Sequence, residues 1–447
     1  PTLTNIAMTT SGNSGYAKSG DTVTLTITVS ETVTALACTI DGEAATMGGS
    51  GTSWTAALTM SGDETAGAAT FSCGSHTDAA ANVGSADTTA DSGAVTFDFV
   101  VPTLGTVGIA TAGTGNANDG DDVTLTFTAS ETIQTPGCTI KDGGGNTMDN
   151  SVTTTHTGSN VWTCVVETNN ADANGAMSFS IAFSDSAGNA GVADTTVDDG
   201  SSVTIDNTHP TASAAVLAIA GTGNGNNGDS MTLTITPSET IGTPTCVFKS
   251  GGAAMANTVA YSTDGADHIC TIAVADADTD GSVTFTLDFS DSAGNAATQV
   301  TSASAGAVTI DNTHPTLGTV GIATAGTGNA NDGDDVTLSF TASEGIQTPT
   351  CTMKDGGGNT MDNSVAVTEG SSNAWTCVVD THDNDADGAV TFSIAFSDDA
   401  NNAGTADTSV DDSSSVTIDN THPTLTNIAM TTSGNSGYAK SGDTVTL

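Results

Sequence analysis

The sequence repeats itself, and the repeat length sets the size of the folding unit. Residues 1–25 recur without change as residues 423–447, which gives a long period of 422 residues. Within that period, prolines mark the starts of shorter units: Pro1, Pro102, Pro210, Pro315 and Pro423. We therefore expect a continuous polypeptide that extends beyond both ends of this segment. Its domains are predicted at 1–101, 102–209, 210–314 and 315–422, with 423–447 as the start of the next repeat.

Each unit carries short runs in which apolar and polar residues alternate. In the second unit these runs read TLGTVGIA, DDVTLTFTAS, PGCTIK, NVWTCVVE, AMSFSIAFS and SSVTID, with Gly, Asp and Asn between them. Alternation with a period of two predicts β-strands, and regularly spaced turn residues predict a sandwich of about seven antiparallel strands. We expect an all-β chain of tandem sandwiches, arranged as beads or as a rod.

The charge of the chain limits its partners. It has 51 acidic residues against 5 basic ones, a net charge of −46, and no arginine. Nucleic-acid binding is excluded as a function, because so few basic groups cannot neutralise phosphates. The charge suits saline water and divalent cations. No apolar run is long enough to predict a membrane span.

Cysteines occur two to a unit, which predicts one disulfide per domain. The pairs are Cys38 and Cys73, Cys138 and Cys164, Cys246 and Cys270, and Cys351 and Cys377. The first unit differs, because Ala56 stands where Cys164 is expected from alignment of the two Trp-Thr motifs. Unpaired thiols are the alternative, but small sandwiches with few aromatic residues gain stability from a bridge. Oxidised bridges predict an extracellular protein.

Acidic loops before the sixth strand are a first candidate calcium site. Alternating carboxylates closed by a glycine are typical of the first half of a calcium-binding loop. They occur in the third unit and in the fourth: Asp276, Asp278 and Asp280 before Gly281, and Asp383, Asp385 and Asp387 before Gly388. The second half of such a loop is missing, and an ordinary Asp-Gly turn is the alternative.

The linkers are a second candidate calcium site. The motif VTIDNTHP places Asp206 and Asp311 just before a unit-starting proline. In a sandwich, the loops after the second and sixth strands lie at the end that faces the preceding linker. These loops contribute Glu239 and Glu344, and Asp291 and Asp399. A calcium ion held by such a set would stiffen each joint. The alternative is a flexible chain with solvated acids.

The linker after the first unit departs from this pattern. It reads VTFDFVVP, so that Phe99, Val100 and Val101 replace Asn-Thr-His. An apolar linker is unusual at a solvated hinge. These residues are expected either to dock the neighbouring domains or to form a lateral contact between chains.

No catalytic motif is present. The sequence has no nucleophile elbow, HExxH or P-loop, and GTGNANDG lies between two strands without a following helix. We therefore expect that the protein is not an enzyme.

Three motifs recur in register: TFTASE, FSDSAGNAG and VTIDNTHPT. Together they resemble the bacterial-type immunoglobulin-like repeats of giant extracellular adhesins and surface fibre proteins. The resemblance covers every unit, although HTDAAANVG in the first unit departs from it. It implies extender domains, some with calcium between them. Asp206, Asp311 and Asp419 match the junction motif, and Asp185, Asp291 and Asp399 match the loop motif.

The sequence thus favours a secreted or cell-surface structural protein, a disulfide-reinforced stalk or fibre. Its expected partners are other repeats of the same polypeptide, including lateral self-association, and an external surface or glycan. The alternative is a ligand-binding adhesin module for a glycan, a mineral or ice. A flat row of outward threonines or aromatic residues would support that alternative.

Overall fold

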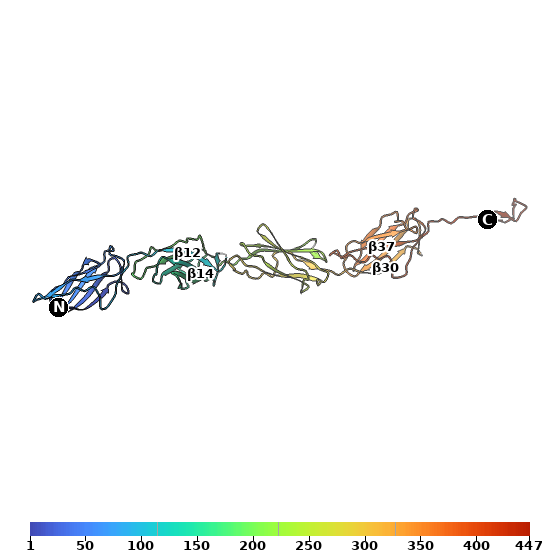
Figure 1. Cartoon of the computed structure of the whole chain (residues 1–447). Helices are drawn as coiled ribbons and strands as arrows, with labels where there is room; N and C mark the ends of the chain where they lie inside the picture. Colours follow the sequence, from blue (N-terminus) through green and yellow to red (C-terminus); the bar gives the residue numbers. More distant parts are fainter. Residues whose placement is uncertain (114, 222, 327) are drawn as a thin grey trace. The chain divides into compact units, whose positions relative to one another are not determined.

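The computed structural model describes residues 1–113, 115–221, 223–326 and 328–447. Within these ranges every helix or strand assigned is a β-strand. Contacts divide the chain into two compact units. The first comprises Pro1–Pro210 with Glu239–Gly242 and Ser290–Ala297, and the second comprises Thr211–Ser238, Thr243–Phe289 and Thr298–Leu447. Figure 1 follows the strands along the chain by colour.

The second repeat, in the first unit, shows how the alternating runs become a sandwich. One sheet has the order β12-β14-β17-β16, and the strands β15-β19 and β13-β20-β18 form the other layer. Figure 1 labels β12 and β14. The bounds are β12 Leu104–Thr111, β13 Asn116–Ala117, β14 Asp122–Ala129, β15 Gly137–Lys141, β16 Thr153–Gly158, β17 Val161–Glu167, β18 Gly175–Ala176, β19 Ser178–Ala182 and β20 Thr204–Ile205. This strand order is that of an immunoglobulin-like sandwich, as the sequence predicts.

The core of the second repeat follows from the alternation. Val123, Leu125 and Phe127 of β14 are fully buried, while the threonines between them face outward. Trp162 and Cys164 of β17 continue the same cluster on the neighbouring strand. Since successive strand residues point to opposite faces, each strand supplies one row to the core.

The first repeat is a divergent copy of this sandwich. Its sheets are β1-β3-β9-β10 with β6 beside β3, β2-β11-β7, and β5-β4-β8. The bounds are β1 Leu3–Thr10, β2 Tyr16–Ala17, β3 Thr22–Ala35, β4 Cys38–Ile40, β5 Glu43–Ala44, β6 Thr46–Thr59, β7 Gly67–Ala68, β8 Phe71–Cys73, β9 His76–Asp78, β10 Val83–Gly84 and β11 Thr96–Phe97. Its core is a separate hydrophobic cluster.

The strands β21 to β29 of the third repeat belong to the second unit. They form the sheets β21-β23-β27-β26 and β22-β29-β28-β24-β25. The bounds are β21 Ala212–Ile219, β22 Asn224–Gly225, β23 Ser230–Pro237, β24 Thr245–Ser250, β25 Ala253–Ala254, β26 Ala260–Asp264, β27 Asp267–Ala273, β28 Gly281–Asp288 and β29 Thr309–Ile310.

The fourth repeat has the strand order of the second. Its sheets are β30-β32-β35-β34, β33-β37 and β31-β38-β36, followed by the isolated pair β39-β40. The bounds are β30 Leu317–Thr324, β31 Asn329–Ala330, β32 Asp335–Ala342, β33 Thr350–Lys354, β34 Ala366–Glu369, β35 Ala374–Asp380, β36 Gly388–Ala389, β37 Thr391–Ala395, β38 Thr417–Ile418, β39 Thr431–Thr432 and β40 Val445–Thr446.

All eight cysteines are paired within their own repeats: Cys38–Cys73, Cys138–Cys164, Cys246–Cys270 and Cys351–Cys377. The last three bridges join the two layers of a sandwich, as Cys138 on β15 and Cys164 on β17 illustrate. In the first repeat, Cys38 on β4 lies directly opposite Cys73 on β8 in one sheet. The displaced cysteine noted in the sequence therefore changes the kind of bridge.

Across the residues that the structure describes, no helix is long and apolar enough to cross a membrane.

Candidate metal centres at the linkers

Three linkers each bring together three carboxylates. Each group combines a linker aspartate with a glutamate and an aspartate from two loops, and its ligand atoms lie within 4.8 Å of one another. We call these groups the linker triads. They are Asp98, Glu131 and Asp185 and Asp206, Glu239 and Asp291, both in the first unit, and Asp311, Glu344 and Asp398 in the second.

The loop aspartate is held by an asparagine four residues later. In the second unit, Asp398 accepts hydrogen bonds from the backbone and side-chain nitrogens of Asn402, each at 2.8 Å. Asp185 and Asn189 repeat this arrangement in the first unit. Because the aspartate is buried, these bonds fix the position of its carboxylate.

The same asparagine also holds the linker. Its side-chain amide donates to the backbone carbonyl of the linker aspartate. The distances are 2.9 Å for Asn189 to Asp98, 2.7 Å for Asn295 to Asp206 and 2.7 Å for Asn402 to Asp311. One amide group therefore connects the loop to the linker in each triad.

The glutamate of each triad is placed by the serine before it. Ser343 accepts a hydrogen bond from the backbone N–H of Thr316 at 3.0 Å, and Thr316 follows the linker proline. Ser130 accepts from Thr103 in the same way. This bond anchors the start of each repeat beside the loop that carries Glu131 or Glu344, which explains the recurring Ser-Glu pair.

Burial and mutual repulsion both act on these carboxylates. Burial raises the pKa of Glu344, and the charges of Asp311 and Asp398 raise it further. The pKa values of Glu131 and Glu239 are raised by the same causes. Burial also raises the pKa of Asp311, although a hydrogen bond from the N–H of Thr313 opposes it. The ionised triads are therefore electrostatically unfavourable by themselves.

The donor set suits a hard cation. All three side chains of a triad offer carboxylate oxygens, and no nitrogen or sulfur ligand is among them. Oxygen-only sets of this kind are preferred by calcium, which also accepts backbone carbonyls and waters. In the first unit, one carboxylate oxygen of Glu239 is buried without a hydrogen-bond partner. A cation would satisfy that oxygen.

The linker triads contain five of the predicted linker residues: Asp206, Glu239, Asp291, Asp311 and Glu344. The sixth prediction was wrong by one residue, because the aspartate that joins Asp311 is Asp398. Asp399 is exposed and corresponds to the serine after Asp185. The sequence FSDDANN offers two adjacent aspartates, and only the first has an asparagine four residues later.

The triad at the first linker was missed as a candidate metal site. Asp98 precedes an apolar segment instead of Asn-Thr-His, so the linker motif of Asp206 and Asp311 does not identify Asp98 or its partner Glu131. Both residues occupy the register positions of their counterparts, so alignment of the Ser-Glu and Asp-x3-Asn spacings alone would have found this triad.

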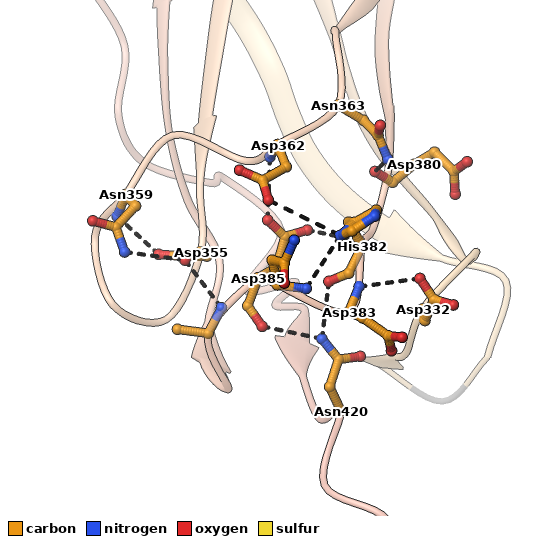
Figure 2. A network of polar contacts seen from close by, with 12 residues as sticks. Asp332, Asp355, Asn359, Asp362, Asn363, Asp380, His382, Asp383, Asp385 and Asn420 are labelled. Carbon is orange, nitrogen blue, oxygen red and sulfur yellow. Dashed lines mark hydrogen bonds and ion pairs between the residues drawn. The ribbon is translucent and has the colours of Figure 1, made fainter.

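The predicted acidic loops form no such triad among the described residues. In the fourth repeat, Asp385 accepts hydrogen bonds from the N–H groups of His382 and Asp362, as Figure 2 shows. Asp387 accepts from the N–H of Asn420, and the backbone N–H of Asp383 donates to Asp332. These acids hold the turn and the following linker, which is the alternative that the sequence left open.

The third repeat uses its acidic loop similarly. Asp278 accepts from the N–H groups of Ala275 and Ala256, and Asp280 accepts from Asn312 and Thr313. No contact places Asp276 in a metal-ligating group within the described ranges. Calcium in these loops stays a prediction.

The glycine after each acidic loop has a backbone role. Gly281 has a φ of +135°, and a Cβ there would lie 2.9 Å from the Cα of Gly251. Gly388 has a φ of +137°, and a Cβ there would lie 2.9 Å from the Cα of Gly356. A side chain would be excluded at both positions, so the glycine is explained without a cation.

The apolar first linker divides into two parts. Phe99 packs against the core of the first repeat, with its ring centroid 6.2 Å from that of Phe97. Val100 and Val101 are 59% and 51% exposed, and Val101 lines a shallow groove with Val192, which is 87% exposed. At the next linker, the counterpart of Val101 is His209, whose Nδ1 lies 2.8 Å from the carbonyl oxygen of Ala296.

No family model matches this chain, and no curated protein matches it either. Among solved structures, the I-band fragment I67–I69 of titin covers 72% of this chain and is covered completely, with 11% identity and a TM-score of 0.34. A tetra-tandem repeat in the extending region of a large adhesion protein covers 93% of this chain and is covered completely, with 17% identity and a TM-score of 0.33. The D1–D4 ectodomain fragment of ICAM-5 covers 92%, with 99% of its own length matched, 11% identity and a TM-score of 0.29. The assignment of the fold rests on the strand order described above.

Proposed function

We propose that this chain belongs to an extracellular structural protein and forms a disulfide-reinforced stalk that acts as a spacer in surface adhesion or cohesion. We further propose that a calcium ion at each linker triad fixes the joint between successive repeats. The observation that carries this proposal is the recurrence of the same three carboxylates at three successive linkers.

The electrostatics supply the reason for a cation. Each triad places three acidic groups within 4.8 Å in a chain whose net charge is −46. Like charges at this distance repel strongly when they are partly buried. A divalent ion would replace that repulsion with attraction and would join the linker aspartate to two loops of the following repeat.

The disulfides support an extracellular location. Each repeat carries one bridge, and protein disulfides persist mainly in oxidising compartments. Bridged domains resist complete extension, which suits a spacer that transmits tension. An external surface and other repeats of the same polypeptide remain the proposed partners. The exposed Val100 and Val101 are the proposed site of lateral self-association.

Calorimetric titration of the metal-free chain with calcium tests the proposal. We expect three sites, and we expect Glu344→Gln to lose one of them, because the amide removes a charge without changing shape. Glu369→Gln is the matched control, since Glu369 is exposed at the end of β34 and belongs to no triad. Unchanged binding by Glu344→Gln, or no binding by the parent chain, would contradict the proposal.

A further inference from the structure

The three linker triads share their carboxylates but differ in the charges around them. Two positions in the repeat before each linker lie next to a triad. The first, which we call the loop-side position, is in a turn beside the loop aspartate, and the second, the linker-side position, is in a turn that holds the linker. In the order of the triads, the loop-side residues are Lys18, Asn118 and Asn226, and the linker-side residues are Ala66, Asn174 and Asp280.

The loop-side position of the first triad is a lysine. A Cβ placed on Gly188 would lie 3.7 Å from the Cε of Lys18. Gly188 belongs to the turn of the loop aspartate, because its N–H donates to the carbonyl oxygen of Asp185 at 3.1 Å. At the second triad, the Nδ2 of Asn118 would lie 3.4 Å from a Cβ placed on Gly294. A positive charge thus lies beside the first triad where the second has a neutral amide.

The backbone at the loop-side position is the same with either side chain. The N–H of Lys18 donates to the carboxylate of Asp21 at 2.9 Å, and the N–H of Asn118 donates to that of Asp121 at 3.0 Å. The turn therefore accepts lysine and asparagine equally, and an exchange of the two changes the charge alone.

The linker-side position of the third triad is an aspartate. Asp280 accepts hydrogen bonds from the N–H of Asn312 at 2.7 Å and from the hydroxyl of Thr313 at 2.6 Å. Its carboxylate therefore lies beside the residues that follow Asp311. Burial raises the pKa values of Asp311 and Glu344 most, and the charge of Asp280 raises both further. The third triad is thus in the field of a fourth acid.

The second triad has an asparagine with the same contacts. The Oδ1 of Asn174 accepts from the N–H of Asn207 at 2.9 Å, and its Nδ2 donates to the hydroxyl oxygen of Thr208 at 2.7 Å. Asparagine and aspartate therefore fill one structural position with different charge. At the first triad the position is Ala66, which precedes Gly67 and has no polar side chain.

The loop of the third triad carries one more acid. Asp399 follows Asp398, and the corresponding residues of the other two loops are Ser186 and Ser292. Asp399 is exposed, so solvent and salt screen its charge more strongly. These positions together place one positive charge beside the first triad, none beside the second and two negative charges beside the third.

We propose that these neighbouring residues grade the cation affinity of the linker triads, so that the third triad binds calcium most tightly and the first most weakly. A unit charge about 8 Å from a divalent ion in water-like surroundings changes the affinity about fivefold. The joints would then become fixed one after another as the calcium concentration rises. This inference rests on the proposed function, because it requires calcium at the triads.

Chains with a single intact triad separate the three affinities. Glu239→Gln/Glu344→Gln leaves the first triad, Glu131→Gln/Glu344→Gln leaves the second, and Glu131→Gln/Glu239→Gln leaves the third. Calorimetric titration with calcium gives the Kd of each chain, and circular dichroism confirms that each is folded. We expect the Kd to fall about fivefold at each step from the first triad to the third.

Exchanges between repeats then test each position. Asp280→Asn should weaken the third triad about fivefold, and Asn174→Asp should strengthen the second by the same factor. Lys18→Asn should strengthen the first. The matched controls are Asp264→Asn at the exposed end of β26 and Lys249→Asn at an exposed position of β24, which change the same charges away from the triads. Both controls should leave the Kd values unchanged.

Two results would overturn the grading while calcium binding itself stands. One is an equal Kd for the three single-triad chains, and the other is an effect of Asp280→Asn no larger than that of Asp264→Asn. If the parent chain with all three triads bound no calcium, both the grading and the proposed function would be overturned.

Discussion

The side-chain amide of Asn402 donates to the backbone carbonyl of Asp311 at 2.7 Å, although the two residues are 91 positions apart. The same amide donates to the carboxylate of Asp398 at 2.8 Å. One asparagine therefore links the end of one repeat to a loop of the next within the second unit. This contact positions two of the three acids of the triad before any ion is considered.

Replacement of Asn402 by alanine is expected to weaken both the joint and its cation affinity. Two hydrogen bonds are lost, and the carboxylate of Asp398 loses its fixed position, at a cost of about 1 kcal/mol per bond. Thermal unfolding in the presence of a chelator and calorimetric calcium binding measure the two effects. Asn384→Ala should leave both unchanged, because no hydrogen bond of its side chain is present in the structure; an equal effect of the two variants would contradict this account.

The disulfides are expected to limit how far each repeat extends under force. Replacement of Cys351 and Cys377 by alanine frees a segment with a sequence separation of 26, so the contour length released on unfolding should rise by about 90 Å. The bridge should also contribute about 2–4 kcal/mol to stability. Single-molecule extension measures the first effect and denaturant unfolding the second. The parent chain under reducing conditions is the control, because reduction breaks the same bridge. If the cysteine replacement left the released contour length unchanged, the bridge would not form in the parent chain.

Acid should destabilise the fourth repeat through Asp355. Hydrogen bonds from the backbone N–H groups of Ala386, Asn359 and Gly357 hold the pKa of Asp355 below its ordinary value. The stability that this group contributes is therefore complete above the unfolded pKa of 3.8 and is lost as the pH falls through the lower folded value.

Trp375 reports this transition in a chain with Trp54→Phe and Trp162→Phe. Asp355→Asn should lower the stability at neutral pH and flatten its dependence on pH in the acid range. Asp399→Asn is the control, because Asp399 is exposed. Parallel acid curves for the parent and Asp355→Asn would refute the role of Asp355.

The exposed valines of the first linker should promote association of chains. The double variant Val101→Asp/Val192→Asp places two negative charges in the groove that these two residues line. Sedimentation at high protein concentration and high salt, where repulsion is screened, should show association of the parent chain and less of the variant. Ala406→Asp, in the corresponding groove of the fourth repeat, is the control. If the parent chain stayed monomeric at every concentration, the proposed association through these valines would be contradicted.

The fold could be predicted because its signals are local and repeated. Runs such as DVTLTFTA alternate strictly, and their buried and exposed positions follow that alternation in β14 and β32. The cysteine pairs could be predicted because each repeat offers only two. The change to a bridge within one sheet in the first repeat needed the pairing of β4 with β8, which the sequence does not encode as a pattern.

The linker triads were predictable only in part, because their residues lie far apart in the sequence. Loop topology placed Glu344 beside Asp311, but the choice between Asp398 and Asp399 depended on Asn402, whose hydrogen bonds define the loop. The acidic loops show the opposite problem. Alternating aspartates can hold a cation or cap backbone N–H groups, and only the structure showed that Asp385 does the latter.

Small-angle X-ray scattering of the oxidised chain, with calcium and after chelation, tests the central claim most directly. If cations fix the linkers, calcium should give a larger maximum dimension and a narrow distance distribution, and chelation should shorten and broaden that distribution. Glu344→Gln should respond less than Glu369→Gln at equal calcium. Identical scattering with calcium and after chelation would contradict joints that are fixed by metal ions. The carboxylates of the triads would then be solvated acids without a role in the stiffness of the chain.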